Sequence, residues 1–63
     1  MNISTNMRIV EKYDSFISDD KRESYIINEA DANIATLQYL LNEESNNELA
    51  ETLESLIKEL EEE

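Results

Sequence analysis

Apolar residues recur at helical spacing along most of the chain, and the clearest case is the stretch from residue 45 to residue 63. Its leucines stand three or four positions apart, at Leu49, Leu53, Leu56 and Leu60, and seven glutamates occupy other positions of the stretch. A helix gathers such positions on one side, so the pattern predicts a helix over 46–61 with an apolar seam and a negative outer face. Ser45 and Glu48 fit a capping box at its start. Because an isolated amphipathic helix is only marginally stable in water, this helix needs another helix to pack against.

A second helix is predicted over 20–42, because its apolar positions step by three and four residues as in a heptad pattern. These positions are Ile27, Ala30, Ile34, Leu37 and Leu41. Asp20 and Glu23 fit a capping box at the start of this helix. The polar residues 42–47, with the sequence NEESNN, predict a tight turn, so the second and last helices are expected to form an antiparallel hairpin.

The segment 7–17 also carries apolar residues three and four positions apart and predicts a first helix, with Ser4 or Thr5 as its N-cap. The alternative is a β-hairpin over residues 7–27, in which residues 9–13 pair with residues 25–27 across the polar ISDDKR turn. The chain contains no glycine to support such a turn, and more apolar positions match the helical period. The helix is therefore favoured.

These elements predict an all-α fold, a single acidic domain over 1–63 built as a bundle of two or three helices and completed by dimerisation. A chain of 63 residues has a marginal core, and the absence of cysteine and histidine leaves no disulfide or zinc site to stabilise it. We therefore expect association with a second copy of the chain to stabilise the fold. The expected self-association seam consists of Ile27, Ile34, Leu37, Leu41, Leu49, Leu53, Leu56 and Leu60.

The composition argues against catalysis. Without histidine or cysteine, no serine or tyrosine has a plausible activating base, and adjacent carboxylates on helices point in different directions. A calcium loop at Asp19 and Asp20 is also disfavoured, because Lys21 and Arg22 occupy the next ligand positions and the turn glycine is missing. We therefore expect no enzyme activity, no cofactor and no bound metal.

The charge is strongly negative, with 16 acidic against 5 basic residues and a net charge of −11. All of this net charge lies from Glu23 onward, because residues 1–22 contain equal numbers of acids and bases. Such a surface repels nucleic acid and anionic lipid, and no apolar run approaches the roughly 20 residues needed to cross a bilayer. We expect a cytoplasmic protein, or one in the host cytoplasm if a phage encodes it, whose partner is a protein with a basic surface.

Two functional hypotheses follow. In the first, the protein is an inhibitor or anti-repressor whose acidic helical face occupies the nucleic-acid-binding surface of a target protein. The expected partner-binding carboxylates are Glu44, Glu48, Glu51, Glu54 and Glu59. In the second, a dimeric helical adaptor or regulatory protein binds a partner helix through the apolar seam. In size and composition, small acidic chains without glycine resemble the anti-defence and anti-repressor proteins of bacteriophages.

Overall fold

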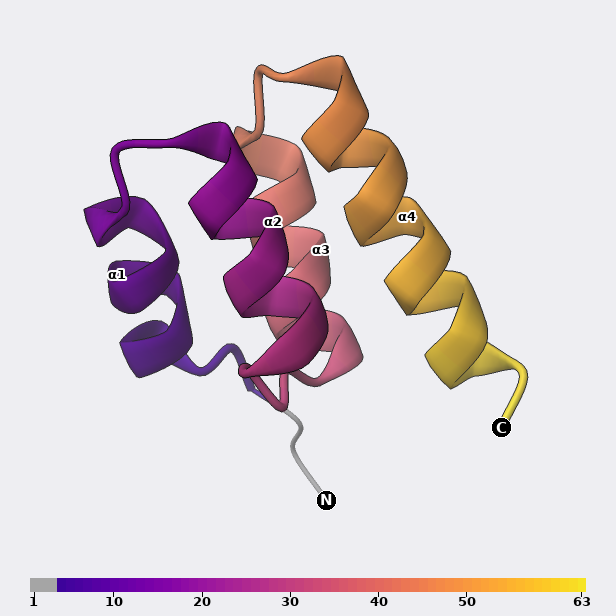
Figure 1. Ribbon diagram of the computed structural model, residues 1–63. Helices are drawn as coiled ribbons and strands as arrows, with labels where there is room; N and C mark the ends of the chain where they lie inside the picture. The colour runs from indigo at the N-terminus through magenta and orange to yellow at the C-terminus, as the bar shows by residue number, and fades with distance from the viewer. Residues whose placement is uncertain (1–3) are drawn as a thin grey trace.

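A computed structural model describes residues 4–63, which form four short helices joined by tight loops. Helix α1 spans Met7–Ser15, α2 spans Asp19–Asn28, α3 spans Ile34–Glu43 and α4 spans Asn47–Glu61. Successive helices run in opposite directions, as Figure 1 shows. The predicted small all-α bundle is confirmed, with four helices in place of two or three. Residues 4–63 contain no strand, so the β-hairpin alternative is wrong.

The single helix predicted over 20–42 is wrong, because residues 29–33 separate α2 from α3. Helix α2 ends where the backbone N–H groups of Glu29 and Ala30 both donate to the carbonyl of Tyr25 at 2.9 Å. Asn33 caps the start of α3, and its Oδ1 accepts hydrogen bonds from the backbone N–H of Thr36 at 2.8 Å and from the Thr36 hydroxyl at 2.6 Å. This cap starts a new helix in a new direction, so the heptad pattern does not form one continuous seam.

The helices begin at side chains that accept hydrogen bonds from the first turn. The caps are Asn6, Ser18, Asn33 and Asn46. Asparagine and serine are favoured there because a short side-chain oxygen satisfies an N–H group that has no partner within the helix. The predicted caps at Ser4 or Thr5, at Asp20 and at Ser45 are thus one or two positions from the observed ones.

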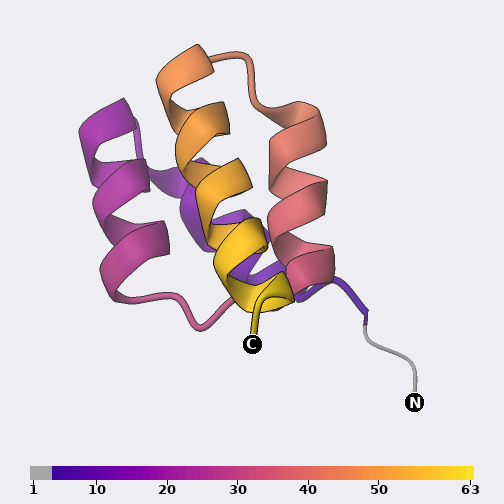
Figure 2. The same cartoon turned by 90° about the vertical axis from the view of Figure 1, so that its right-hand side faces the viewer.

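Each helix packs against two others, and one core lies between all four. Helix α1 packs on α2 and α3, and α4 packs on the same two helices from the other side (Figure 2). The core cluster consists of Val10, Tyr13, Tyr25, Ile26, Leu37, Leu40, Leu53 and Ile57. The hydroxyl of Thr52 also donates to Glu23 at 2.8 Å and joins α4 to α2. Residues of all four helices thus contribute to one core within a single chain.

Candidate functional site

The outer side of α4 carries three members of the predicted acidic face. Asn46 caps the start of this helix, and its Oδ1 accepts hydrogen bonds from the backbone N–H groups of Glu48 at 2.9 Å and Leu49 at 3.2 Å. Its buried residues, Leu49, Leu53 and Ile57, repeat every four positions and turn one side of the helix to the core. Glu48, Glu51 and Glu54 lie off this side and are all exposed. Neighbours three apart on a helix have Cβ atoms about 5–6 Å from each other, so these carboxylates form a row, which we call the acidic face.

No carboxylate of the acidic face forms an ion pair within residues 4–63. Within residues 4–63, the one ion pair joins Arg22 to Asp19 in the first turn of α2. Lys58 is the single basic residue of α4, and it forms no ion pair with a carboxylate of the described chain. The three carboxylates are thus hydrated and available to a basic partner.

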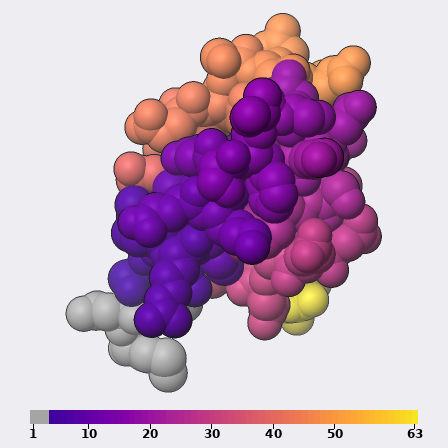
Figure 3. Space-filling view, turned by 60° about the vertical axis from the view of Figure 1, so that its left-hand side comes forward, coloured from indigo at the N-terminus to yellow at the C-terminus, as the bar shows by residue number. Residues whose placement is uncertain are grey.

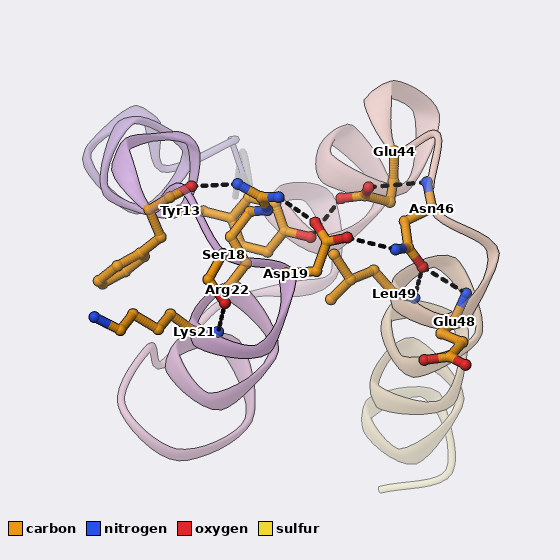
Figure 4. Close-up of polar contacts among 10 residues, drawn as sticks. Tyr13, Ser18, Asp19, Lys21, Arg22, Glu44, Asn46, Glu48 and Leu49 are labelled. Carbon is orange, nitrogen blue, oxygen red and sulfur yellow. Dashed lines mark hydrogen bonds and ion pairs between the residues drawn. The ribbon is translucent and has the colours of Figure 1, made fainter.

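Glu44, predicted to belong to the same face, is instead partly buried and turned into the molecule (Figure 4). Its Oε1 accepts a 2.5 Å hydrogen bond from the hydroxyl of Tyr13, and its Oε2 accepts from the backbone N–H of Asn46 at 3.1 Å. Burial, and then the hydrogen bond and charge of Glu44, raise the pKa of Tyr13 above its usual value of 10.0. Both carboxylate oxygens are therefore used within the chain, where they connect α1 to the start of α4.

Glu44 belongs to a group of interacting side chains that joins all four helices at one end of the bundle (Figure 4). We call Tyr13, Asp19, Arg22, Glu44 and Asn46 the polar cluster. Arg22 donates to the backbone carbonyl of Phe16 and to the carboxylate of Asp19. The Nδ2 of Asn46 donates to the second oxygen of Asp19 at 2.6 Å. Hydrogen bonds from Arg22 and then Asn46 hold the pKa of Asp19 below its usual value of 3.8.

The sequence does not predict the polar cluster: it offers Asp19 only as a disfavoured calcium ligand and Glu44 only as a member of the acidic face. The members of the cluster come from α1, α2 and the loop between α3 and α4, and Tyr13 and Glu44 are 31 positions apart. No local spacing relates such residues. The one available signal is the pair of polar breaks at 18–20 and 42–47, which the alternating helix directions bring to the same end of the bundle.

Apolar side chains surround an open groove at the other end of the bundle, where α2 and α4 finish. A hollow of about 170 Å³ is lined by Ile26, Ile27, Ala30, Asp31, Ala32, Leu37, Leu56, Glu59, Leu60 and Glu63. A second hollow of about 360 Å³ shares Asp31, Ala32 and Leu60 with it and adds Asn33 and Ile34. We call these two adjoining hollows the basal groove. Glu59, the last predicted member of the acidic face, lies on its rim.

The predicted self-association seam is divided between the core and this groove. Leu37, Leu49 and Leu53 are at most 2% exposed and are buried within their own chain, although Leu37 also lines the first hollow of the groove. The other seam residues are more accessible: Ile34, Leu41, Leu56 and Leu60 are partly buried, and Ile27 is 49% exposed. Four of these five line the basal groove. A partner that binds the predicted seam would therefore contact it at the basal groove. The buried seam residues pack within the chain and stabilise the fold.

Among residues 4–63, no group of three or more carboxylate, histidine or cysteine side chains is placed to hold a metal ion. No helix within the same residues combines the length and apolar character that a membrane span requires. No protein family, curated protein or solved structure matches this chain. The candidate sites are thus two surfaces, the acidic face and the basal groove.

Proposed function

We propose that the protein is a non-enzymatic inhibitor or anti-repressor that binds a target protein through its acidic face. One observation carries this proposal: Glu48, Glu51 and Glu54 form an exposed row on α4, and no ion pair within residues 4–63 involves them. Exposed like charges in a row create a negative potential that attracts a basic surface. The target is a protein whose basic surface otherwise contacts nucleic acid.

The distribution of charge supports this choice of partner. Nine of the sixteen acidic residues lie from Glu43 onward, against the single base Lys58. A surface that binds phosphates presents Lys and Arg side chains at intervals of several ångströms, and carboxylates about 5–6 Å apart on a helix can pair with several of them. Complementary charge of this kind accelerates association and makes it weaker at high salt.

The test compares two variants that each remove three negative charges. The face variant carries Glu48→Gln, Glu51→Gln and Glu54→Gln. The control variant carries Glu11→Gln, Asp14→Asn and Asp20→Asn, at exposed positions of α1 and α2. Figure 3 shows the side of the molecule that α1 and α2 form, on which α4 appears only at the edges. Each set includes one acid from the first turn of a helix, Glu48 or Asp20, so the two variants lose similar helix-dipole stabilisation.

Each tagged protein is used to capture partners from a bacterial lysate at low salt, and bound proteins are quantified in a salt gradient. We expect the wild type and the control variant to retain a nucleic-acid-binding protein that the face variant loses. Addition of that protein's own nucleic acid should release it from the wild type. Equal loss from both variants would show that net charge, rather than the acidic face, governs retention.

A second candidate function, that of a dimeric adaptor binding a partner helix, is supported by the four accessible seam residues at the basal groove. They are Ile27, Ile34, Leu56 and Leu60. Sedimentation equilibrium of the wild type and of Ile27→Ser tests the homodimer, since a dimer formed at the groove should weaken in the variant. If the wild type sediments as a monomer at all concentrations, the homodimer is wrong.

A further inference from the structure

The basal groove gathers accessible apolar side chains in one place. Ile27 is 49% exposed, and Ile34, Leu56 and Leu60 are partly buried around the same two adjoining hollows. Single exposed apolar residues are ordinary on soluble proteins, and Ile17, which is 97% exposed in the α1–α2 loop, is an example. Apolar residues that line a concave groove differ from single exposed ones, because an apolar side chain bound in the groove is removed from water on several sides at once.

The rim of the groove is acidic. Asp31, Glu59 and Glu63 line the first hollow and are exposed, and no lysine or arginine lines either hollow. This limits what can occupy the groove. A second copy of the chain would bring two acidic rims together, and like charges juxtaposed in an interface oppose association. A neutral apolar segment would cover the carboxylates partly without pairing them, which costs free energy of hydration.

The rim is also continuous with the acidic face. Glu48, Ser55 and Glu59 lie along one side of α4, because residues seven and eleven positions apart share a side of a helix. The distance along the axis from Glu48 to Glu59 is about 16 Å at 1.5 Å per residue. One helical segment of about 11 residues or more could therefore contact the acidic face and the groove together.

We propose that the basal groove binds an apolar side chain from a basic amphipathic helix of the target protein, with lysine or arginine residues one turn away contacting Asp31 and Glu59. This docking site rests on the proposed function, because the same target would lie along the acidic face. The acidic face supplies the charge attraction, and the groove selects a helix that carries an apolar side chain at the matching position.

The test uses three synthetic 14-residue helical peptides and ¹⁵N-labelled protein. The first peptide combines lysine, leucine and alanine with its leucines on one side, the second has serine at each leucine position, and the third has glutamate in place of lysine. We expect the lysine–leucine peptide to shift the amide signals of Ile27, Ala32 and Leu60 together with those of Glu48–Glu54. The serine peptide should shift only the signals of Glu48–Glu54, and the glutamate peptide should shift neither these signals nor those of the groove.

Two matched variants distinguish binding at the groove from nonspecific binding of the peptide to exposed apolar residues. Ile27→Ser should weaken binding of the lysine–leucine peptide about tenfold, which corresponds to the loss of a few buried methylene groups. Ile17→Ser makes the same substitution at the other end of the bundle and should leave the affinity unchanged. Shift mapping on the wild type does not depend on either variant folding.

Equal affinities of the leucine and serine peptides, with no shift at the groove, would overturn the docking site and leave the proposed function standing. Failure of both basic peptides to shift Glu48–Glu54 would instead count against the acidic face. If the groove signals shift with protein concentration and without peptide, the occupant is a second copy, and the partner proposed here is wrong.

Discussion

The hydroxyl of Tyr13 donates a 2.5 Å hydrogen bond to Oε1 of Glu44, a residue 31 positions further along the chain. This contact joins α1 to the loop before α4. The second oxygen of Glu44 accepts from the N–H of Asn46, which caps α4, so one carboxylate connects the first helix to the start of the last. The chain thus uses Glu44 internally, as it also uses Asp19 and Glu23, and leaves the carboxylates of the acidic face to solvent.

Removal of the Tyr13 hydroxyl should destabilise the bundle. In Tyr13→Phe, Oε1 of Glu44 loses its donor at a partly buried position, and we expect a loss of about 1.5 kcal/mol in the free energy of unfolding, typical of a hydrogen bond to a charged group. Urea unfolding followed by circular dichroism measures it. Tyr39→Phe is the control, because Tyr39 is 39% exposed. Equal effects of the two substitutions would contradict the role given to the Tyr13–Glu44 contact.

The same contact predicts a loss of stability in alkaline solution. The folded-state pKa of Tyr13 lies above the 10.0 expected for the unfolded chain, so the fold favours the neutral phenol. This contribution is fully present below the unfolded pKa and is lost as the pH rises above it, because the unfolded chain then releases a proton that the folded chain retains.

Urea midpoints between about pH 8 and pH 11 should therefore decline at the alkaline end. The decline should be smaller in Tyr13→Phe. It should not vanish, since burial also raises the pKa of Tyr25. A decline of the same size in Tyr13→Phe and the wild type would show that Tyr13 does not contribute.

The cap at Asn33 should contribute more than an ordinary surface asparagine. Its Oδ1 accepts from Thr36, and its Nδ2 donates to the carbonyl of Ser4 at 2.9 Å, so it both starts α3 and holds the segment before α1. Asn33→Ala should cost about 1 kcal/mol or more of the free energy of unfolding. Asn47→Ala, at the exposed first residue of α4, serves as the comparison. Equal losses would show that Asn33 has no special role.

Part of the fold could be predicted from apolar periodicity. The last helix was expected over 46–61 and is Asn47–Glu61, and the first was expected over 7–17 and is Met7–Ser15. The break at 29–33 was not predicted, because alanines there continue the apolar pattern and favour helix formation. The decisive residue is Asn33, and its value as a cap depends on Thr36 and on the distant carbonyl of Ser4.

Part of the candidate site could also be predicted from the sequence. Exposure of Glu48, Glu51 and Glu54 follows from the period of one helix and needs no tertiary information. The inward position of Glu44 depends on Tyr13, which no local pattern relates to it. The basal groove likewise exists because the chain reverses at 29–33 and places the end of α2 beside the end of α4. These features required the three-dimensional arrangement.

The most direct test of the proposed function measures the affinity of the captured target for three purified proteins, the wild type, the face variant and the control variant, over a range of salt concentrations. If the acidic face binds the target, the face variant should bind at least about tenfold more weakly at low salt and show a shallower salt dependence. The control variant should match the wild type. Equal affinities and equal salt dependences for the face and control variants would contradict the proposal that α4 carries the binding surface.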